Sequence, residues 1–146
     1  MSGTRGDERG STVSDDERDI ERLLLRYASA VDDRDWDMFR DCFTEEVDAD
    51  YGDIGSWGSA GELTEFMVAA HAGFGTSHHM VTNVVVDLDG DAATSRCHVH
   101  AVLTLLEDPN RWFDTVGSYR DHLVRTPAGW RIAARTFRAT RIISGP

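Results

Sequence analysis

Residues 75–83 read GTSHHMVTN, and this stretch separates two hydrophobic patterns in the 146-residue chain. Before it, apolar residues recur every three or four positions, which is typical of amphipathic helices. After it, apolar and polar residues alternate, which is typical of strands with one buried face. The chain therefore predicts helices first and a sheet afterwards, an α+β arrangement with helices laid on one face of the sheet.

Three helices are predicted in the first half of the chain. The first starts near residue 14 or 15, where three consecutive acidic residues suit the positive end of a helix dipole. A second, short helix is expected at residues 33–43 and a third at residues 59–72, where glycines end it. Between these two we expect a short strand at residues 47–51 and an irregular, glycine-rich return.

Four strand segments are predicted in the second half. They are residues 84–88, 92–106, 112–125 and 130–143, joined by turns such as Asp89-Gly90. A curved antiparallel sheet covered by helices forms a cone with a pocket at its open end. Strand alternation gives the second segment one small, apolar face, which we expect to be concave: Ala93, Ser95, Cys97, Val99, Ala101 and Leu103.

The charge and hydropathy of the chain argue against two classes of partner, nucleic acids and membranes. The formal net charge is -11, with 15 basic residues scattered among acids, which argues against a nucleic-acid partner. No apolar run approaches the ~20 residues that span a bilayer, so no membrane partner is expected. Residues 1–15 lack the apolar segment of a secretory signal, so we expect a disordered tail before one domain, residues 16–146, and a cytoplasmic protein.

Five segments carry a resemblance to a known superfamily: RYASAVDDRDW (26–36), VDADYGD (47–53), TSHHMVTN (76–83), VDLDGDAATSR (86–96) and YRDHLVRTPAGWRIAAR (119–135). Through them the chain resembles the SnoaL-like branch of the nuclear transport factor 2-like (NTF2-like) superfamily over about residues 15–143. The resemblance is nearest to the scytalone dehydratase, bile-acid 7α-dehydratase and lindane dehydrochlorinase types. It implies an NTF2-like cone, with three N-terminal helices packed on a curved, mostly antiparallel sheet around a pocket.

The same resemblance implies a catalytic histidine–aspartate pair. The family's aspartate follows the first helix and precedes the second, which selects Asp32, or Asp33 if the register differs by one residue. The family's general-base histidine precedes a small or amide residue by four positions. His79, four residues before Asn83, fits that spacing better than His78 does.

Other pocket residues are also implied by the resemblance. Tyr27 and Tyr51 match pocket tyrosines of the family, whose hydroxyls can donate hydrogen bonds to a developing enolate oxygen. Arg141 is the nearest match to a pocket arginine of the bile-acid enzymes. We expect four more side chains to contribute to substrate binding: Asn83, Trp57, Phe66 and Cys97.

The strand histidines have a different expected role. The family's second pocket histidine falls at Leu103, so the two-histidine arrangement of scytalone dehydratase is not expected. His98 and His100 belong to the opposite strand face, where with His122 they could ligate a metal. We prefer a contact between subunits there, so we predict no metal site and a homodimer through the outer sheet face.

These residues predict a cofactor-independent lyase or isomerase of dehydratase type. A histidine can take and return a proton near neutral pH, and a carboxylate orients it. The substrate would be a small, apolar cyclic compound. The alternatives are a polyketide cyclase or epoxide-hydrolase-like enzyme that relies on acidic residues, and a non-catalytic ligand-binding or accessory subunit, since one fold hosts many functions.

Overall fold

The computed structural model describes residues 12–146. Its helices are α1 (Val13–Asp33), α2 (Trp36–Asp41) and α3 (Ala60–His71), with a short 3-10 helix, η1 (Gly52–Ile54). Its strands are β1 (Phe43–Asp50), β2 (Ser56–Ser59), β3 (Phe74–Asp89), β4 (Ala92–Leu105), β5 (Trp112–Thr126) and β6 (Gly129–Gly145).

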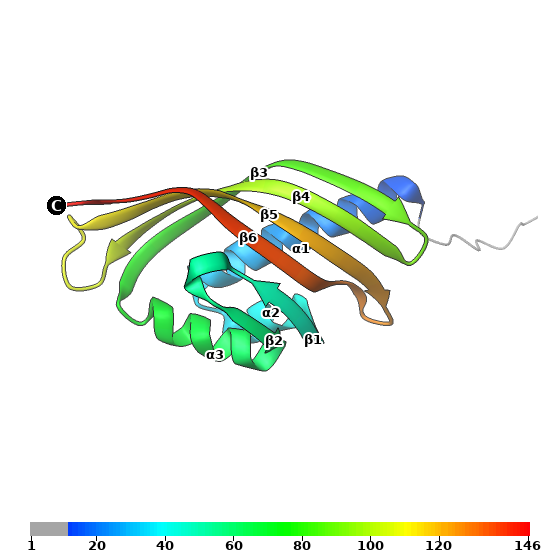
Figure 1. Cartoon of the computed structure of the whole chain (residues 1–146), viewed down its shortest axis with the longest axis horizontal. Helices are drawn as coiled ribbons and strands as arrows, with labels where there is room; N and C mark the ends of the chain where they lie inside the picture. The colour runs from blue at the N-terminus through cyan, green and yellow to red at the C-terminus, as the bar shows by residue number, and fades with distance from the viewer. Residues whose placement is uncertain (1–11) are drawn as a thin grey trace, which may run out of the picture.

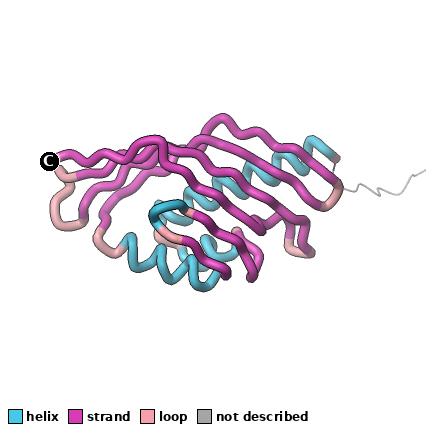
Figure 2. The backbone as a smooth tube through the Cα atoms, viewed as in Figure 1, coloured by secondary structure: helices cyan, strands magenta, loops and turns pink. Residues whose placement is uncertain are grey.

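The six strands form one sheet in the order β2-β1-β6-β5-β4-β3. Strands β1 and β6 are parallel, and every other neighbouring pair is antiparallel. The sheet arches over the helices, with α1 running beneath the long strands and α3 beside β1 and β2 (Figures 1 and 2). The predicted α+β class, with three helices on a curved and mostly antiparallel sheet, is confirmed.

The strands differ from the sequence prediction at their ends. Strand β3 begins at Phe74, so the GTSHHMVTN stretch belongs to the sheet, and its residues 77–82 pair one by one with β4. Strand β1 begins at Phe43 and shortens the predicted second helix. The expected irregular return contains β2, which pairs with β1. These pairings link distant residues, and local periodicity does not report them.

Helix α1 begins within the predicted N-terminal tail. Thr12 caps it, because its Oγ1 accepts a hydrogen bond from the Asp15 backbone N–H at 3.1 Å. Residues 13–15 therefore form the first turn of the helix, and residues 1–11 lie outside the described residues. Within residues 12–146, no helix is long and apolar enough to cross a bilayer. The cytoplasmic location stays a prediction.

Both ends of α1 are fixed to the sheet by arginines. At the first turn, Arg125 Nη1 and Nη2 donate to the Asp16 carboxylate at 2.9 and 2.8 Å. At the last turn, Arg34 takes a left-handed conformation, with φ of 55°. Its Nη1 donates to Ser77 Oγ at 2.8 Å and its Nη2 to the Gly75 carbonyl at 2.7 Å. The helix therefore crosses the concave face in a defined position.

The core lies between α1 and the concave face of the sheet. Ile20, Leu24 and Val31 of α1 are almost completely buried, as are Leu123 and Ile132 of the sheet. Each such side chain contributes about 1.5–3 kcal/mol through its burial. The predicted inward face of β4 is also confirmed, since all six of its members are buried: Ala93, Ser95, Cys97, Val99, Ala101 and Leu103.

A buried ion pair crosses the core beneath α1. Arg135 is 1% exposed, and its Nε and Nη2 each donate to the Asp121 carboxylate at 2.8 Å. Its guanidinium lies against the rings of Tyr27 and Tyr119, at 4.2 and 3.9 Å from their centroids. Burial opposes the charge of Arg135, but Asp121 outweighs this effect and holds the pKa of Arg135 well above its usual value.

Removing the carboxylate should therefore destabilise the protein strongly. We expect Asp121→Ala to lower the free energy of unfolding by about 3–5 kcal/mol, because it leaves a buried charge without its partner. Urea denaturation measures the change. The matched control is Asp50→Ala, which breaks the solvent-exposed pair with Arg138 (2.9 Å) and should change stability little. Equal losses in the two variants would contradict a structural role for the buried pair.

Candidate active site

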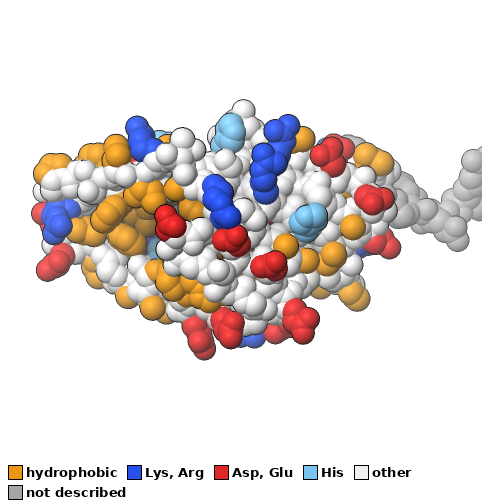
Figure 3. Space-filling view, viewed as in Figure 1, with side chains coloured by type: hydrophobic (Ala, Val, Ile, Leu, Met, Phe, Trp, Pro, Cys, Tyr) orange, Lys and Arg blue, Asp and Glu red, His pale blue; other side chains and the backbone are white. Residues whose placement is uncertain are grey.

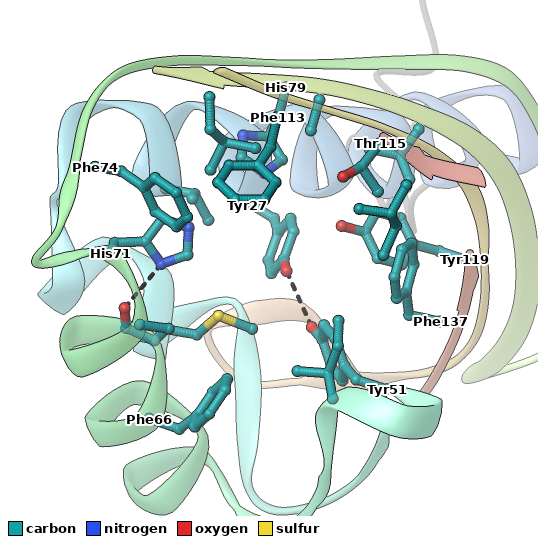
Figure 4. Close-up of a pocket in the computed structure, with 18 residues that line it drawn as sticks. Tyr27, Tyr51, Phe66, His71, Phe74, His79, Phe113, Thr115, Tyr119 and Phe137 are labelled. Atoms are coloured by element: carbon teal, nitrogen blue, oxygen red, sulfur yellow. Dashed lines mark hydrogen bonds between the residues drawn. The ribbon is translucent and has the colours of Figure 1, made fainter. Parts of the chain in front are cut away.

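A cavity of about 260 Å³ opens between α1, α3 and the concave face of the sheet. Its lining is mostly apolar and includes Phe66, Phe74 and Phe113 (Figure 4). Among the described residues, the lining contains no aspartate, glutamate, lysine or arginine. Three lining residues, Ile54, Ala70 and Ile142, are exposed, which identifies the entrance. Hydrophobic side chains surround a hollow near the end of β6 (Figure 3).

His79 and Asp32 form a hydrogen-bonded pair at one wall of the cavity. His79 Nδ1 lies 2.7 Å from Asp32 Oδ1, and the His79 backbone N–H donates to Asp32 Oδ2 at 2.8 Å. The two side chains are 11% and 20% exposed, respectively. His79 also lines the cavity (Figure 4). The imidazole therefore has one edge on the carboxylate and another toward the space a ligand would fill.

The state of the carboxylate fixes the histidine tautomer. Burial alone would raise the pKa of Asp32, but hydrogen bonds from the His79 side chain and backbone, and from Ser77, outweigh it and lower that pKa. An ionised carboxylate can only accept hydrogen bonds, so His79 Nδ1 must carry the proton. When His79 is neutral, its Nε2 is free of a proton and can accept one.

Arg34 and Ser77, which were not among the site residues predicted from the sequence, hold this pair in place. Ser77 Oγ accepts from Arg34 Nη1 and donates to Asp32 Oδ1 at 3.0 Å. Arg34 also donates to the Val31 carbonyl at 2.6 Å, in the last turn of α1. The guanidinium thus joins the end of α1 to the start of β3, the two elements that supply Asp32 and His79.

Tyrosine hydroxyls form the floor of the cavity. Tyr27 and Tyr51 line it, and their hydroxyl oxygens are 3.0 Å apart (Figure 4). The two hydroxyls have two protons and use one in this bond, so one remains for another acceptor. Burial raises the pKa of Tyr51 and of Tyr119 well above the usual value, which keeps both phenols neutral donors. Arg135 lies directly behind Tyr27 and Tyr119.

A second histidine, His71, lines the cavity at the end of α3. Its Nδ1 lies 2.8 Å from the Met67 carbonyl oxygen. Burial lowers the pKa of His71, and this effect exceeds the opposing one of the Met67 hydrogen bond. His71 was not among the site residues predicted from the sequence, although its spacing indicated it. His71 lies four positions after Met67 and eight after Leu63, and both of these side chains are buried.

Comparison with known proteins identifies the family. A family model described as the SnoaL-like domain matches residues 12–136. The chain belongs to this family. The uncharacterized protein Rv2910c of Mycobacterium tuberculosis is 32% identical to it over 121 residues, which make up 82% of each chain. The resemblance found in the sequence segments is therefore confirmed at the level of the family.

Solved structures show the same fold for this SnoaL-like domain. A putative aromatic ring hydroxylase from Novosphingobium aromaticivorans is 26% identical, with a TM-score of 0.84 over 92% of this chain and 96% of that one. A putative scytalone dehydratase from the same organism is 19% identical, with a TM-score of 0.81 over 88% and 87%. A hexachlorocyclohexane dehydrochlorinase is 14% identical, with a TM-score of 0.77 over 88% of each chain. The last two likenesses show the NTF2-like fold alone.

Not all the expected pocket residues of this SnoaL-like domain lie in the cavity. Phe66 lines it, whereas Trp57 lies behind Phe66, with ring centroids 4.3 Å apart. Cys97 is a buried free thiol outside the lining, and burial raises its pKa to about 11. Asn83 is exposed and lies outside the lining. Arg141 is exposed as well and donates to Asp114 at 3.0 Å.

Backbone irregularities explain the positions of Asn83 and Arg141. Asn83 has a φ of 56°, and the pairing of β3 with β4 shifts register between residues 82 and 85. The pairing of β5 with β6 shifts between residues 116 and 117, opposite residues 139–141. Each shift reverses which alternate residues face the cavity. Ile142 therefore lines the cavity where simple alternation would have placed Arg141.

The sequence also allowed His78 or Asp33 as a member of the histidine–aspartate pair, and both lie away from the cavity. His78 is exposed and neighbours His79 on the strand, so its side chain leaves the opposite face of the sheet. Asp33 is exposed at the end of α1 and lies outside the cavity lining. Of the two histidines and two aspartates considered, the structure joins His79 to Asp32.

The strand histidines lie outside the cavity. His98 and His122 are exposed, and His100 Nε2 lies 2.9 Å from Asp114 Oδ2 on the outer face. Within residues 12–146, no group of three or more histidine, cysteine, aspartate or glutamate side chains is arranged to hold a metal ion. A contact between two subunits at this face stays a prediction.

The lowered pKa of His71 predicts a pH dependence of stability. His71 should bind a proton more weakly in the folded chain than in the unfolded chain, whose histidines titrate near about 6.5. As the pH falls through that value, the unfolded state gains the proton first, so stability should decrease. Urea denaturation at pH 7.5 and 5 should show a smaller decrease for His71→Gln than for the wild type. An equal decrease would contradict the lowered pKa.

Proposed function

We propose that this SnoaL-like domain is a cofactor-independent lyase or isomerase of dehydratase type. It would remove a proton from a small, apolar cyclic substrate. The observation that carries the proposal is the environment of His79. One edge of its ring is hydrogen-bonded to Asp32, and the ring lines an apolar cavity. A base held by a carboxylate beside a water-poor space is suited to abstract a proton from carbon.

The proton would follow a short path. His79 Nε2 accepts the proton as the substrate C–H bond breaks, and the electron pair of that bond moves into the substrate. Asp32 stabilises the imidazolium that forms, and Ser77 and Arg34 keep the carboxylate in place. The imidazolium then returns the proton. In a dehydration it protonates the departing hydroxyl, and in an isomerisation it protonates a different carbon.

The tyrosine floor would stabilise the negative charge that develops. The Tyr27–Tyr51 pair retains one hydroxyl proton that can be donated to an enolate oxygen. The buried charge of Arg135 lies against the Tyr27 ring at 4.2 Å and favours negative charge above it. These donors are already fixed before the substrate binds, so little reorganisation accompanies the reaction.

The alternative enzymes on this fold have less support. A cyclase or epoxide-hydrolase-like enzyme that relies on acidic residues needs carboxylates facing the substrate. The lining has none among the described residues, and Asp32 accepts three hydrogen bonds from Ser77 and His79. With such an enzyme, His79→Ala would have only a mild effect on turnover.

One relative favours a second candidate function. The putative aromatic ring hydroxylase, at 26% identity, suggests an accessory or ligand-binding subunit of an oxygenase system. Such a subunit would copurify with a larger partner and would show no proton transfer alone. The homodimer through the outer sheet face also stays a prediction, which sedimentation can test.

Hydrogen–deuterium exchange on a ring ketone tests the proposal without knowledge of the leaving group. The probe is 2-tetralone in D2O, with loss of its α-proton signal followed by NMR. We expect the wild-type protein to accelerate exchange above the buffer rate. His79→Ala should slow the protein-catalysed exchange at least ~100-fold, because it removes the base. His78→Ala is the matched control and should exchange at the wild-type rate, since His78 is exposed on the other face.

Two results of that experiment would contradict the proposal. One is exchange no faster than in buffer, and the other is a rate that His79→Ala leaves unchanged. Thermal denaturation of each variant must show that it is folded. Asp32→Asn should also slow exchange by about 100-fold or more, because it removes the charge that orients and stabilises the histidine.

A separate prediction concerns the hydroxyl groups of Tyr27 and Tyr51 on the floor of the cavity. Tyr51→Phe removes a hydroxyl while keeping the ring that packs at 5.9 Å from Phe137. We expect exchange into 2-tetralone to slow by about 100-fold, the usual cost of one lost donor to an oxyanion. Trp57→Phe is the control, because Trp57 packs behind the lining and donates nothing into the cavity. An unchanged rate in Tyr51→Phe would remove the tyrosines from the mechanism.

A further inference from the structure

His71 places a second imidazole in the cavity that the proposed proton transfer does not use. Its Nδ1 lies 2.8 Å from the Met67 carbonyl, and a carbonyl oxygen can only accept a hydrogen bond. Nδ1 must therefore carry the proton, and Nε2 is bare in the neutral ring. His71 lines the cavity, and Figure 4 shows its Nδ1 bond directed to the backbone, with the other ring nitrogen on the side of the ring away from that bond, beside Phe74.

Aromatic rings fix the orientation of this side chain. The His71 ring packs against Trp36 at 5.5 Å and Phe74 at 5.8 Å, measured between ring centroids. With Nδ1 tied to the helix and both neighbours apolar, the ring has little freedom to turn. Its Nε2 is thus a preoriented hydrogen-bond acceptor in a mostly apolar lining.

The surroundings separate the roles of the two cavity histidines. His79 is backed by the Asp32 carboxylate, which stabilises a positive ring. His71 is backed by a neutral carbonyl, and burial lowers its pKa. The nearby charges on Arg34 and His79 lower it further, and only Asp32 acts in the opposite direction through space. His71 therefore stays neutral while His79 exchanges protons. In other active sites too, different surroundings give two titratable groups different pKa values and so different roles.

We propose that His71 is a specificity-determining residue that accepts a hydrogen bond from a substrate hydroxyl. The inference rests on the proposed function, because it names the substrate class for the same cavity: a neutral ring compound that carries a hydroxyl at the α3 side. A ring without that hydroxyl leaves Nε2 buried and unpaired, which costs affinity. The hydroxyl that His71 binds stays on the substrate, because a bare Nε2 has no proton to give to a leaving group.

The test compares two probes of similar shape. These are 2-naphthol, which donates a hydrogen bond, and 2-methylnaphthalene, which does not. Equilibrium dialysis at pH 7.5 gives the ratio of their affinities for each variant, and this ratio cancels changes that affect both probes. We expect the ratio to shift about tenfold against 2-naphthol in His71→Leu. His71→Gln should recover part of the preference, because its side-chain oxygen can also accept a hydrogen bond.

A further variant separates this inference from the proposed function. His79→Ala should stop exchange into 2-tetralone while the protein still prefers 2-naphthol, and adding His71→Leu to it should shift the ratio about tenfold against 2-naphthol. If the preference is unchanged in His71→Leu, or is lost in His79→Ala instead, the role of His71 is overturned even when the exchange results hold. If exchange is independent of His79 while the preference depends on His71, the proposed function fails and the hydroxyl site stands.

Discussion

The positive charge of Arg135 is the constraint on which the interior depends. A buried guanidinium requires a carboxylate and favourable surroundings, and Asp121 and the faces of two tyrosine rings provide them. Because Tyr27 belongs to α1 and Tyr119 to β5, satisfying this charge also sets the height of the helix above the sheet. The same tyrosine layer becomes the floor of the cavity. Core stability and cavity shape therefore have one common origin.

Two histidines line this cavity, and their partners give them different chemistry. Both have Nδ1 committed to an oxygen, so both offer a bare Nε2 when neutral. The oxygen facing His79 belongs to an ionised carboxylate, while the one facing His71 belongs to a peptide carbonyl. Only the carboxylate beside His79 can balance the positive charge of an added proton. In the proposed function, a proton-transfer group and a fixed acceptor thus arise from one residue type, because the oxygen that Nδ1 contacts differs between the two rings.

The family resemblance implied the pairing of Asp32 with His79, and sequence patterns predicted the helix-to-sheet order and the concave face of β4. They succeeded where strands stay regular, because alternation then reports the face directly. They do not report the positions of Asn83 and Arg141, which lie outside the cavity lining because β3 and β6 shift register there and the faces exchange. No local pattern marks such a shift. Arg135 could have been found, since Asp121 occupies an inward position and needs a buried cation opposite it.

The register shift in β6 also bears on which reactions the site suits. With regular alternation, an arginine would face the entrance and could receive an anionic leaving group such as a halide. Instead Ile142 lines the entrance, and Arg141 pairs with Asp114 on the outer face. The described lining is then uncharged except when a histidine is protonated. In the proposed function, a leaving hydroxyl that is protonated by His79 would depart as neutral water, and an isomerisation would release no group at all. Both reactions fit an uncharged cavity better than the loss of an anion does.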